Sequence, residues 1–222
     1  MQASSRFLPL LCALSFIGLL LGMRGLSFRR RFGHSPFRIP HNDDLSASAF
    51  LSRVLVLFLA AIVVLAIAVA VAPEWLDRID PLYRYRGLAT VFFGIVLMSI
   101  GTVLVWRAQL DMGAAWRVGI DSGQRTELIT RGLFKFCRNP IYLGLQTALF
   151  GFFSLVPSYF MGTLLVVAFL SFQVQARLEE AHLLSQHGDL YASYCRRVGR
   201  FLPWTGRFAG PAADSATDRG QL

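Results

Sequence analysis

The stretch that decides the fold is NPIYLGLQTALFGFFSLVPSYFMGTLLVVAFLSFQVQA, residues 139–176, which has 38 residues and no charged side chain. One helical pass through a bilayer takes about 20 residues, so this stretch is long enough to cross twice. Pro157-Ser158 lies near its middle and predicts a turn. The flanking residues, Arg138 and Arg177-Leu178-Glu179-Glu180, therefore return to one membrane face, where we expect them to form one site.

Three further apolar blocks predict an all-α integral membrane protein. The chain is 55% hydrophobic and only 16% charged, which is typical of membrane proteins. Together the blocks predict about five transmembrane helices, over residues 7–26, 48–72, 87–106, 140–156 and 159–177. The first block has an alternative interpretation as a signal peptide, although no small-x-small cleavage site follows it.

The net charge of +9 predicts a membrane orientation rather than nucleic-acid binding, because the basic residues lie between the spans and leave no separate domain for such a fold. Segments 24–53, 107–138 and the C-terminal segment are rich in arginine, whereas 73–86 is balanced by acidic residues and 154–159 is uncharged. The positive-inside rule then places the N-terminus outside and both the C-terminus and the site in the cytoplasm. Lys135 is the sole lysine, and this arginine bias and the small size suggest a bacterial inner-membrane protein.

Arg138-Asn139-Pro140 predicts a helix start that binds an anion. Asn is a favoured N-cap residue and Pro at the first helical position loses no hydrogen bond. The free N–H groups, the positive helix end and the Arg138 charge together suit a carboxylate or phosphate. Tyr142 adds an aromatic face, and Gly144 allows a ligand or a neighbouring helix to approach the backbone. The alternative is a membrane anchor, since Arg and Tyr commonly flank spans.

Glu179-Glu180 offers a carboxylate for a cationic group such as an amino group. Adjacent helical residues point about 100° apart, so one glutamate suffices for the ligand and the other can hold an arginine. A simpler interpretation is an ion pair between Arg177 and Glu180, three residues apart on the helix. A short helix over 190–199, which begins beyond Gly188, carries Tyr191, Tyr194 and Arg197, and Arg200 follows it directly. It either closes over the site or anchors at the interface.

The histidines and cysteines predict neither a metal site nor a redox pair. His34, His41, His182 and His187 lack metal-ligand spacing. Cys12, Cys137 and Cys195 form no CxxC motif. We therefore expect no metal. No residue pattern marks a dimer face, so the oligomeric state stays open.

Several motifs taken together resemble the isoprenylcysteine carboxyl methyltransferase and phospholipid methyltransferase superfamily. Arg138 to Gly144 is similar to the family's Arg-His-Pro-x-Tyr-x-Gly motif, with Asn139 where the family usually has His. The resemblance continues through Gly132-Leu133-Phe134, Arg177-Leu178-Glu179-Glu180 and the segment from Val198 to Pro203. It covers residues 107–203, with hairpin 140–177 inside it. The chain thus divides into spans over 1–106, a methyltransferase-like region over 107–203 and a disordered tail over 204–222.

The resemblance implies S-adenosyl-L-methionine as cofactor and a lipophilic methyl acceptor. Carried over residue by residue, it implies three sets of site residues. The catalytic candidates are Arg138, Glu180 and Arg200. The cofactor candidates are Leu133, Arg138, Asn139, Pro140, Tyr142, Gly144, Glu179, Glu180 and Tyr191. The substrate candidates are Trp116, Arg117, Tyr194 and Arg197.

The resemblance leaves the acceptor and two other functions open. A prenylated cysteine carboxylate is the family's best-known acceptor, but a small isoprenoid or a lipid headgroup also fits. An NADPH-dependent membrane reductase of the sterol reductase type has a similar Arg-x-Pro-x-Tyr architecture, although such enzymes more often have Arg-Asp where this chain has Glu179-Glu180. A non-enzymatic membrane scaffold is the third interpretation, and it would tolerate the loss of Arg138 and Glu180.

Overall fold

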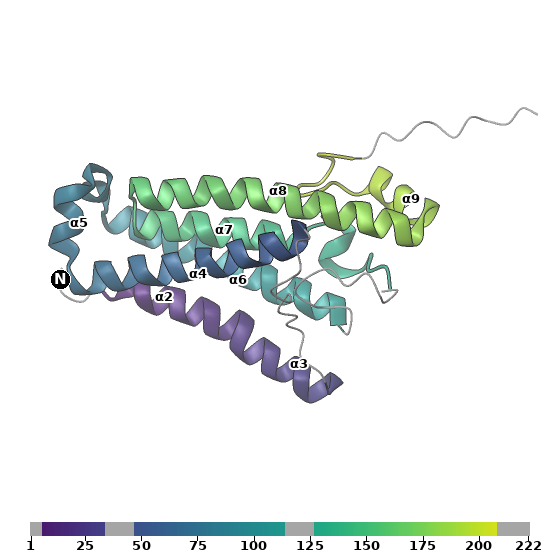
Figure 1. The fold of residues 1–222 in the computed structure, drawn as a ribbon, viewed down its shortest axis with the longest axis horizontal. Helices are drawn as coiled ribbons and strands as arrows, with labels where there is room; N and C mark the ends of the chain where they lie inside the picture. Colours follow the sequence, from purple (N-terminus) through teal and green to yellow (C-terminus); the bar gives the residue numbers. More distant parts are fainter. Residues whose placement is uncertain (1–5, 34–46, 114–126, 208–222) are drawn as a thin grey trace, which may run out of the picture.

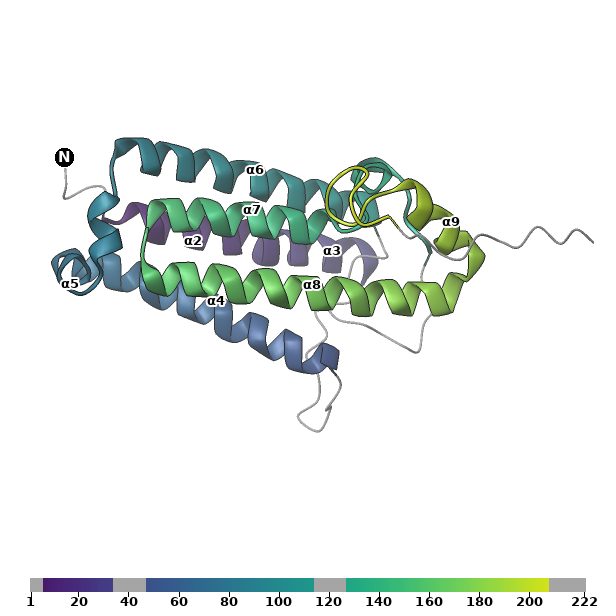
Figure 2. The same cartoon turned by 90° about the horizontal axis from the view of Figure 1, so that it is seen from above.

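A bundle of long helices forms the molecule, which is described here from a computed structural model covering residues 6–33, 47–113 and 127–207. The first helix runs through α2 (Leu8–Ile17), a wider π-helical turn η1 (Gly18–Met23) and α3 (Arg24–Phe32). The other long helices are α4 (Ala47–Val71), α6 (Leu88–Met112), α7 (Pro140–Leu155) and α8 (Tyr159–His187). They run roughly along one long axis, although α2 and α3 diverge from the rest in Figure 1 and α4 diverges in Figure 2.

Short elements close the two ends of the bundle. At one end lie α5 (Pro73–Ile79), η2 (Pro81–Tyr85) and the turn between α7 and α8. At the other lie η4 (Gly132–Lys135), the start of α7 and α9 (Asp189–Arg197). The described residues contain no strand, so the prediction of an all-α integral membrane protein is confirmed.

Four helices of the described chain are long and apolar enough to cross a membrane: Leu8–Arg31, Arg53–Val71, Leu88–Met112 and Tyr159–His187. The fifth predicted span corresponds to α7, a shorter apolar helix of 16 residues. Helix α8 has 29 residues, or about 44 Å at 1.5 Å per residue, which exceeds a hydrocarbon core of about 30 Å. Its last turns therefore extend past the apolar stretch and carry Glu179 and Glu180.

Reciprocal glycine contacts bring α6 and α7 close together. Gly94 faces Gly151, and Gly101 faces Gly144. A Cβ added to Gly101 would lie 2.5 Å from the carbonyl oxygen of Gly144, and one on Gly151 would lie 2.7 Å from that of Gly94. Small residues allow such approach between membrane helices. The packing thus fixes α7, and with it the start of the helix at Asn139, against α6.

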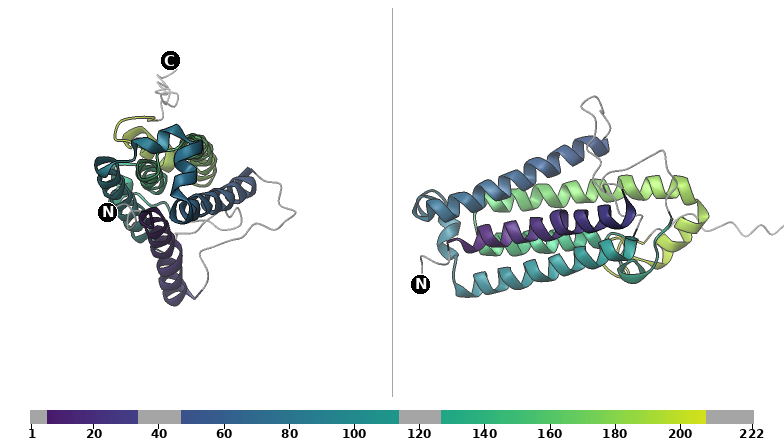
Figure 3. Two further views of the ribbon diagram at one scale, coloured as in Figure 1. Left: turned by 90° about the vertical axis from the view of Figure 1, so that its left-hand side faces the viewer. Right: turned by 90° about the horizontal axis from the view of Figure 1, so that it is seen from below.

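Asp80 fastens the turn between α7 and α8 to the α5 end of the bundle. Its buried carboxylate accepts the Leu82 N–H at 3.0 Å and the Tyr159 N–H at 2.7 Å. Ser158 caps α8 by accepting the Met161 N–H at 3.1 Å, so the turn predicted at Pro157-Ser158 is confirmed. Arg86 adds a hydrogen bond to the Leu155 carbonyl at 2.9 Å. The turn between α7 and α8 is therefore held at the α5 end of the bundle (Figure 3).

Candidate functional site

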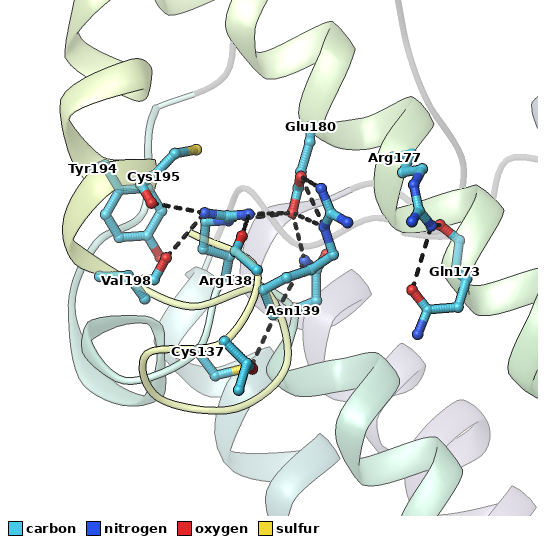
Figure 4. A network of polar contacts seen from close by, with 12 residues as sticks. Cys137, Arg138, Asn139, Gln173, Arg177, Glu180, Tyr194, Cys195 and Val198 are labelled. Carbon is cyan, nitrogen blue, oxygen red and sulfur yellow. Dashed lines mark hydrogen bonds and ion pairs between the residues drawn. The ribbon is translucent and has the colours of Figure 1, made fainter. Parts of the chain in front are cut away.

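Arg138 lies at the centre of a polar network at the α9 end of the bundle (Figure 4). Its side chain is 2% exposed. The Nη1 group donates to the carbonyls of Cys195 at 3.0 Å and Val198 at 2.9 Å, and Nη2 donates to that of Gly206 at 2.9 Å. Nε and Nη2 also reach Glu180 Oε1, at 3.2 and 3.1 Å. These contacts match the five N–H groups of a guanidinium, so none remains for a ligand.

Glu180 joins Arg138 to Arg200 and Asn139. Arg200 contacts both carboxylate oxygens: its Nη2 donates to Oε2 at 2.8 Å, and its Nε lies 3.0 Å from Oε1 and from Oε2. The Asn139 side-chain amide donates to Glu180 Oε1 and to the Arg200 carbonyl, both at 3.2 Å. Glu180 therefore holds two guanidinium groups and an amide, and its two oxygens are fully used by the protein.

Two expectations about this cluster need correction. Asn139 is the residue before α7, but its side-chain oxygen accepts no capping hydrogen bond, and its Nδ2 donates to Glu180 and to the Arg200 carbonyl. Arg177 does not pair with Glu180, because its Nη1 donates to the carbonyl and the side-chain oxygen of Gln173. Figure 4 shows Arg177 apart from the network around Glu180. The first turn of α7 therefore keeps N–H groups without a side-chain cap.

A short backbone pairing holds the chain beyond α9 against the start of α7. The N–H groups of Arg138 and Asn139 donate to the carbonyls of Gly199 at 2.9 Å and Arg200 at 3.1 Å. Arg200 N–H in turn donates to the Thr205 carbonyl at 2.8 Å. Thr205 and Gly206 thus take part in the site, although a disordered tail was expected to begin at residue 204. Residues 208–222 of that tail lie outside the described residues.

Glu179 forms a second, separate network on the membrane side of Glu180. Its Oε1 accepts the Tyr142 hydroxyl at 2.5 Å and the Gln175 amide at 3.2 Å. Among the described residues no cation pairs with Glu179, and its Oε2 accepts no hydrogen bond. The Tyr142 ring stacks on Phe172, with centroids 5.3 Å apart. The two adjacent glutamates therefore differ, since Glu180 is neutralised by the protein and Glu179 is not.

The aromatic residues of α9 pack into the protein. Tyr191 and Tyr194 are buried, their ring centroids are 5.9 Å apart, and the Tyr194 hydroxyl donates to the Phe134 carbonyl at 2.6 Å. Burial raises the pKa of both phenols. Arg197 is exposed. Tyr194 therefore ties α9 to η4, and Arg197 faces outward.

The remaining predicted site residues divide into packed and undescribed ones. Leu133 is half-buried and donates its N–H to Asp111 at 2.9 Å, and Pro140 is buried at the first position of α7. Gly144 faces α6, so the neighbouring helix takes the space that a ligand would need. Trp116 and Arg117 lie outside the described residues.

Residues 89–189 match the model of the phospholipid methyltransferase family. The resemblance predicted from the motifs is therefore confirmed. The matched segment contains nearly all of α6, all of α7 and α8, and the residues Arg138, Glu179 and Glu180. It ends before Arg200, so the second guanidinium on Glu180 comes from beyond the matched segment.

Two individual proteins resemble the chain over different lengths. The nickel-cobalt-cadmium resistance protein NccN of Alcaligenes xylosoxydans xylosoxydans is 30% identical over 108 residues, which are 48% of this chain and 50% of that protein. The structure of the eukaryotic intramembrane Ras methyltransferase ICMT (isoprenylcysteine carboxyl methyltransferase) matches with a TM-score of 0.56 and 19% identity. That match covers 88% of this chain and 66% of ICMT. The chain thus spans half of the curated relative and shares its fold with the solved structure.

Sequence reasoning missed two residues that organise the segment that matches the family model. Asp111 near the end of α6 accepts the Leu133 N–H, which holds η4 against α6, and it pairs with Arg107 at 3.2 Å. Gln175 supports Glu179 from one turn away on α8. The spacing of four between Gln175 and Glu179 was a readable signal. Asp111 gave none, because its partner is a backbone group 22 residues away.

Proposed function

We propose that the chain is an integral-membrane methyltransferase that uses S-adenosyl-L-methionine and acts on a lipophilic acceptor. The observation that carries this proposal is that the segment matching the family model contains two adjacent glutamates in different surroundings. Glu180 is neutralised by arginines, and Glu179 has no cation partner among the described residues. The acceptor class includes carboxylates of the isoprenylcysteine type. We place the protein in the bacterial inner membrane, with the N-terminus outside and the site in the cytoplasm.

The residues present fit the charged end of the cofactor. An α-amino group needs a carboxylate, and Glu179 offers Oε2 with no partner among the described residues. An α-carboxylate needs N–H donors, and the guanidinium of Arg200 and the uncapped first turn of α7 supply them. We therefore assign Glu179, rather than Glu180, to the amino group of the cofactor.

Arg138 and Glu180 act in this proposal as positioning residues. Arg138 donates to three backbone carbonyls between Cys195 and Gly206, and Glu180 holds Arg200 in a fixed orientation. Because Arg200 is 23% exposed and Glu180 only 13%, Arg200 is the member of the cluster that can still contact a ligand. Alignment of this kind contributes to catalysis by fixing groups before the reaction.

S-adenosyl-L-methionine, when bound, supplies a methyl group on a positively charged sulfur. A carboxylate acceptor is ionised at neutral pH and needs no general base, so the chain has only to orient it and exclude water. The ring of Tyr142 gives an aromatic face beside Glu179 that suits a cationic sulfur. Tyr142 and Phe172 together form the apolar boundary between the two glutamates and the spans.

The test is cofactor binding to the purified, detergent-solubilised chain. We expect S-adenosylhomocysteine to bind, as measured by calorimetry, and we expect Glu179→Gln and Arg200→Gln each to weaken it at least tenfold. Arg196→Ala is the matched control, because this exposed arginine lies on α9 outside the network. Thermal melting of each variant separates lost binding from lost folding.

The alternative functions give different results in the same experiment. Binding of NADPH without S-adenosylhomocysteine would overturn the methyltransferase proposal in favour of a membrane reductase. A folded protein that binds neither compound would overturn it in favour of a scaffold. A change of binding in Arg196→Ala equal to that in Glu179→Gln would contradict the assignment of Glu179.

A further inference from the structure

Gln175 has a buried hydrogen-bond acceptor that the protein leaves unused. Its side-chain oxygen, Oε1, is buried and has no hydrogen-bond partner in the described chain. Its Nε2 donates to Glu179 Oε1 at 3.2 Å. Because a carboxylate oxygen only accepts, this contact fixes which atom of the amide is the nitrogen and which is the oxygen. A buried polar atom without a partner is costly, so Oε1 favours a ligand that donates to it.

This open acceptor belongs to a side chain that contacts the Glu179 carboxylate. Gln175 and Glu179 are four residues apart on α8 and share one face of the helix. Glu179 Oε1 accepts from the Tyr142 hydroxyl and from Gln175 Nε2, whereas Oε2 has no partner among the described residues. The two side chains that touch each other therefore present two open acceptors, the neutral Gln175 Oε1 and the charged Glu179 Oε2.

A pair of acceptors of this kind selects a primary ammonium group. Both open atoms only accept, so one group that satisfies both must donate twice, and the carboxylate favours a positive charge on it. An ammonium group has three N–H donors and meets both conditions. A hydroxyl group donates once, and a sulfonium has no N–H to donate.

The arginines around the two glutamates are bonded elsewhere. Arg138 and Arg200 pair with Glu180, and Arg177 donates to Gln173. None of these three cations takes the place beside Glu179, so the ammonium group has to come from a ligand.

We infer that Gln175 Oε1 and Glu179 Oε2 together bind the α-amino group of the cofactor, so that Gln175 is a binding residue as well as a support for Glu179. The inference deepens the proposed function and rests on it, because S-adenosyl-L-methionine is the source of the ammonium group. That cofactor carries two cations, and only its ammonium donates hydrogen bonds. The pair therefore distinguishes the amino end of the cofactor from its sulfur.

The test compares S-adenosylhomocysteine with an analogue that has a hydrogen atom in place of the amino group, by calorimetry on the purified chain in detergent. We expect the wild type to bind S-adenosylhomocysteine more tightly than the analogue. Gln175→Leu should weaken the binding of S-adenosylhomocysteine about tenfold, as the loss of one hydrogen bond to a charged group predicts, and should leave the affinity for the analogue unchanged. Equal weakening of both ligands would overturn the inference.

Two control variants separate direct binding from support of Glu179. Tyr142→Phe removes the other donor to Glu179 Oε1 but no open acceptor, so it should weaken S-adenosylhomocysteine less than Gln175→Leu does. Gln173→Leu changes a glutamine on the same helix that contacts Arg177, and it should bind both ligands as the wild type does. Equal losses in Gln175→Leu and Tyr142→Phe would mean that Gln175 acts only through Glu179, against the inference.

The two proposals fail in different ways in this experiment. If the wild type binds S-adenosylhomocysteine and Gln175→Leu binds it equally well, the assignment of Gln175 alone is refuted. If the folded wild type binds neither ligand, the proposed function is refuted and the inference falls with it. Thermal melting shows which variants are folded, and Gln175→Met, which keeps the side-chain length without the amide, replaces a leucine variant that does not fold.

Discussion

Arg138 and Glu180 form a buried ion pair, and removing one partner leaves the other charge without compensation. Breaking a buried pair in this way costs about 3–5 kcal/mol. We therefore expect Glu180→Gln to lower the melting temperature in detergent strongly, because Arg138 lies 2% exposed beside it. Arg177→Gln is the control, since the exposed Arg177 bonds only within its own helix. Equal melting of the two variants would contradict the role given to Glu180.

Cys137 has a pKa raised to about 11, chiefly because the thiol is buried, while the Asn139 backbone and the Arg138 charge oppose the shift. At pH 8 the folded protein therefore holds less thiolate than an unfolded chain, and we expect slow alkylation that becomes fast in denaturant. The folded pKa exceeds the unfolded value, so the stability from this group is present below pH 9 and is lost as the pH rises towards 11. Melting curves from pH 8 to 11 with Cys137→Ala test this sign, because the alanine variant should lose less stability than the wild type over that range.

The helices could be predicted from the sequence, whereas the hydrogen-bond partners of the site residues could not. The uncharged length of 139–176 and the Pro157-Ser158 turn predicted α7 and α8 to within a few residues at three of their four ends. Helix α8 continues to His187, beyond the predicted end of the span at residue 177. The carbonyls of Cys195, Val198 and Gly206 that hold Arg138 could not be predicted, because backbone groups carry no sequence signal. The capping role expected of Asn139 failed for another reason, since its side chain is held by Glu180, a tertiary contact from a residue 41 positions away.

The α6–α7 interface depends on glycine at the points of closest approach. A larger residue at Gly151 would press against the Gly94 carbonyl and the Met98 N–H, both 2.7 Å from the added Cβ. Overpacking of this kind typically costs about 1–3 kcal/mol, so Gly151→Val should lower the melting temperature. Gly162→Ala on α8 is the matched control, because its new Cβ meets only Phe153 at an ordinary 3.6 Å. Similar melting of the two variants would argue against close packing.

Asp80 supports the hairpin from the other end of the bundle. Asp80→Ala leaves the Tyr159 and Leu82 N–H groups without their acceptor, which typically costs about 1–3 kcal/mol when the groups are buried. We expect lower thermal stability but unchanged affinity for S-adenosylhomocysteine, because the site lies at the opposite end (Figure 1). Asp77→Ala, at an exposed carboxylate, is the control. A change of cofactor affinity would show that the two ends are coupled.

At the scale of the whole molecule, charge and shape together favour one orientation. The α9 end carries the network around Glu180, Arg196 and Arg197, and the basic end of α3 points the same way (Figures 1 and 3). The α5 end balances its basic residues with Glu74, Asp77 and Asp80. Positive loops stay in the cytoplasm, so we expect the candidate site to face the cytoplasm, where the proposed water-soluble cofactor would reach it.

Reporter fusions in a bacterial host test this orientation directly. A fluorescent protein fused after Leu222 should fluoresce, and alkaline phosphatase fused at the same place should be inactive, because it needs the oxidising periplasm. Alkaline phosphatase fused after Tyr85 should be active, since η2 lies at the opposite end of the bundle. Active phosphatase at Leu222 would show that the protein has the opposite orientation in the membrane. It would place Arg138, Glu179 and Glu180 outside the cell, away from the cytoplasmic cofactor that the proposed reaction requires.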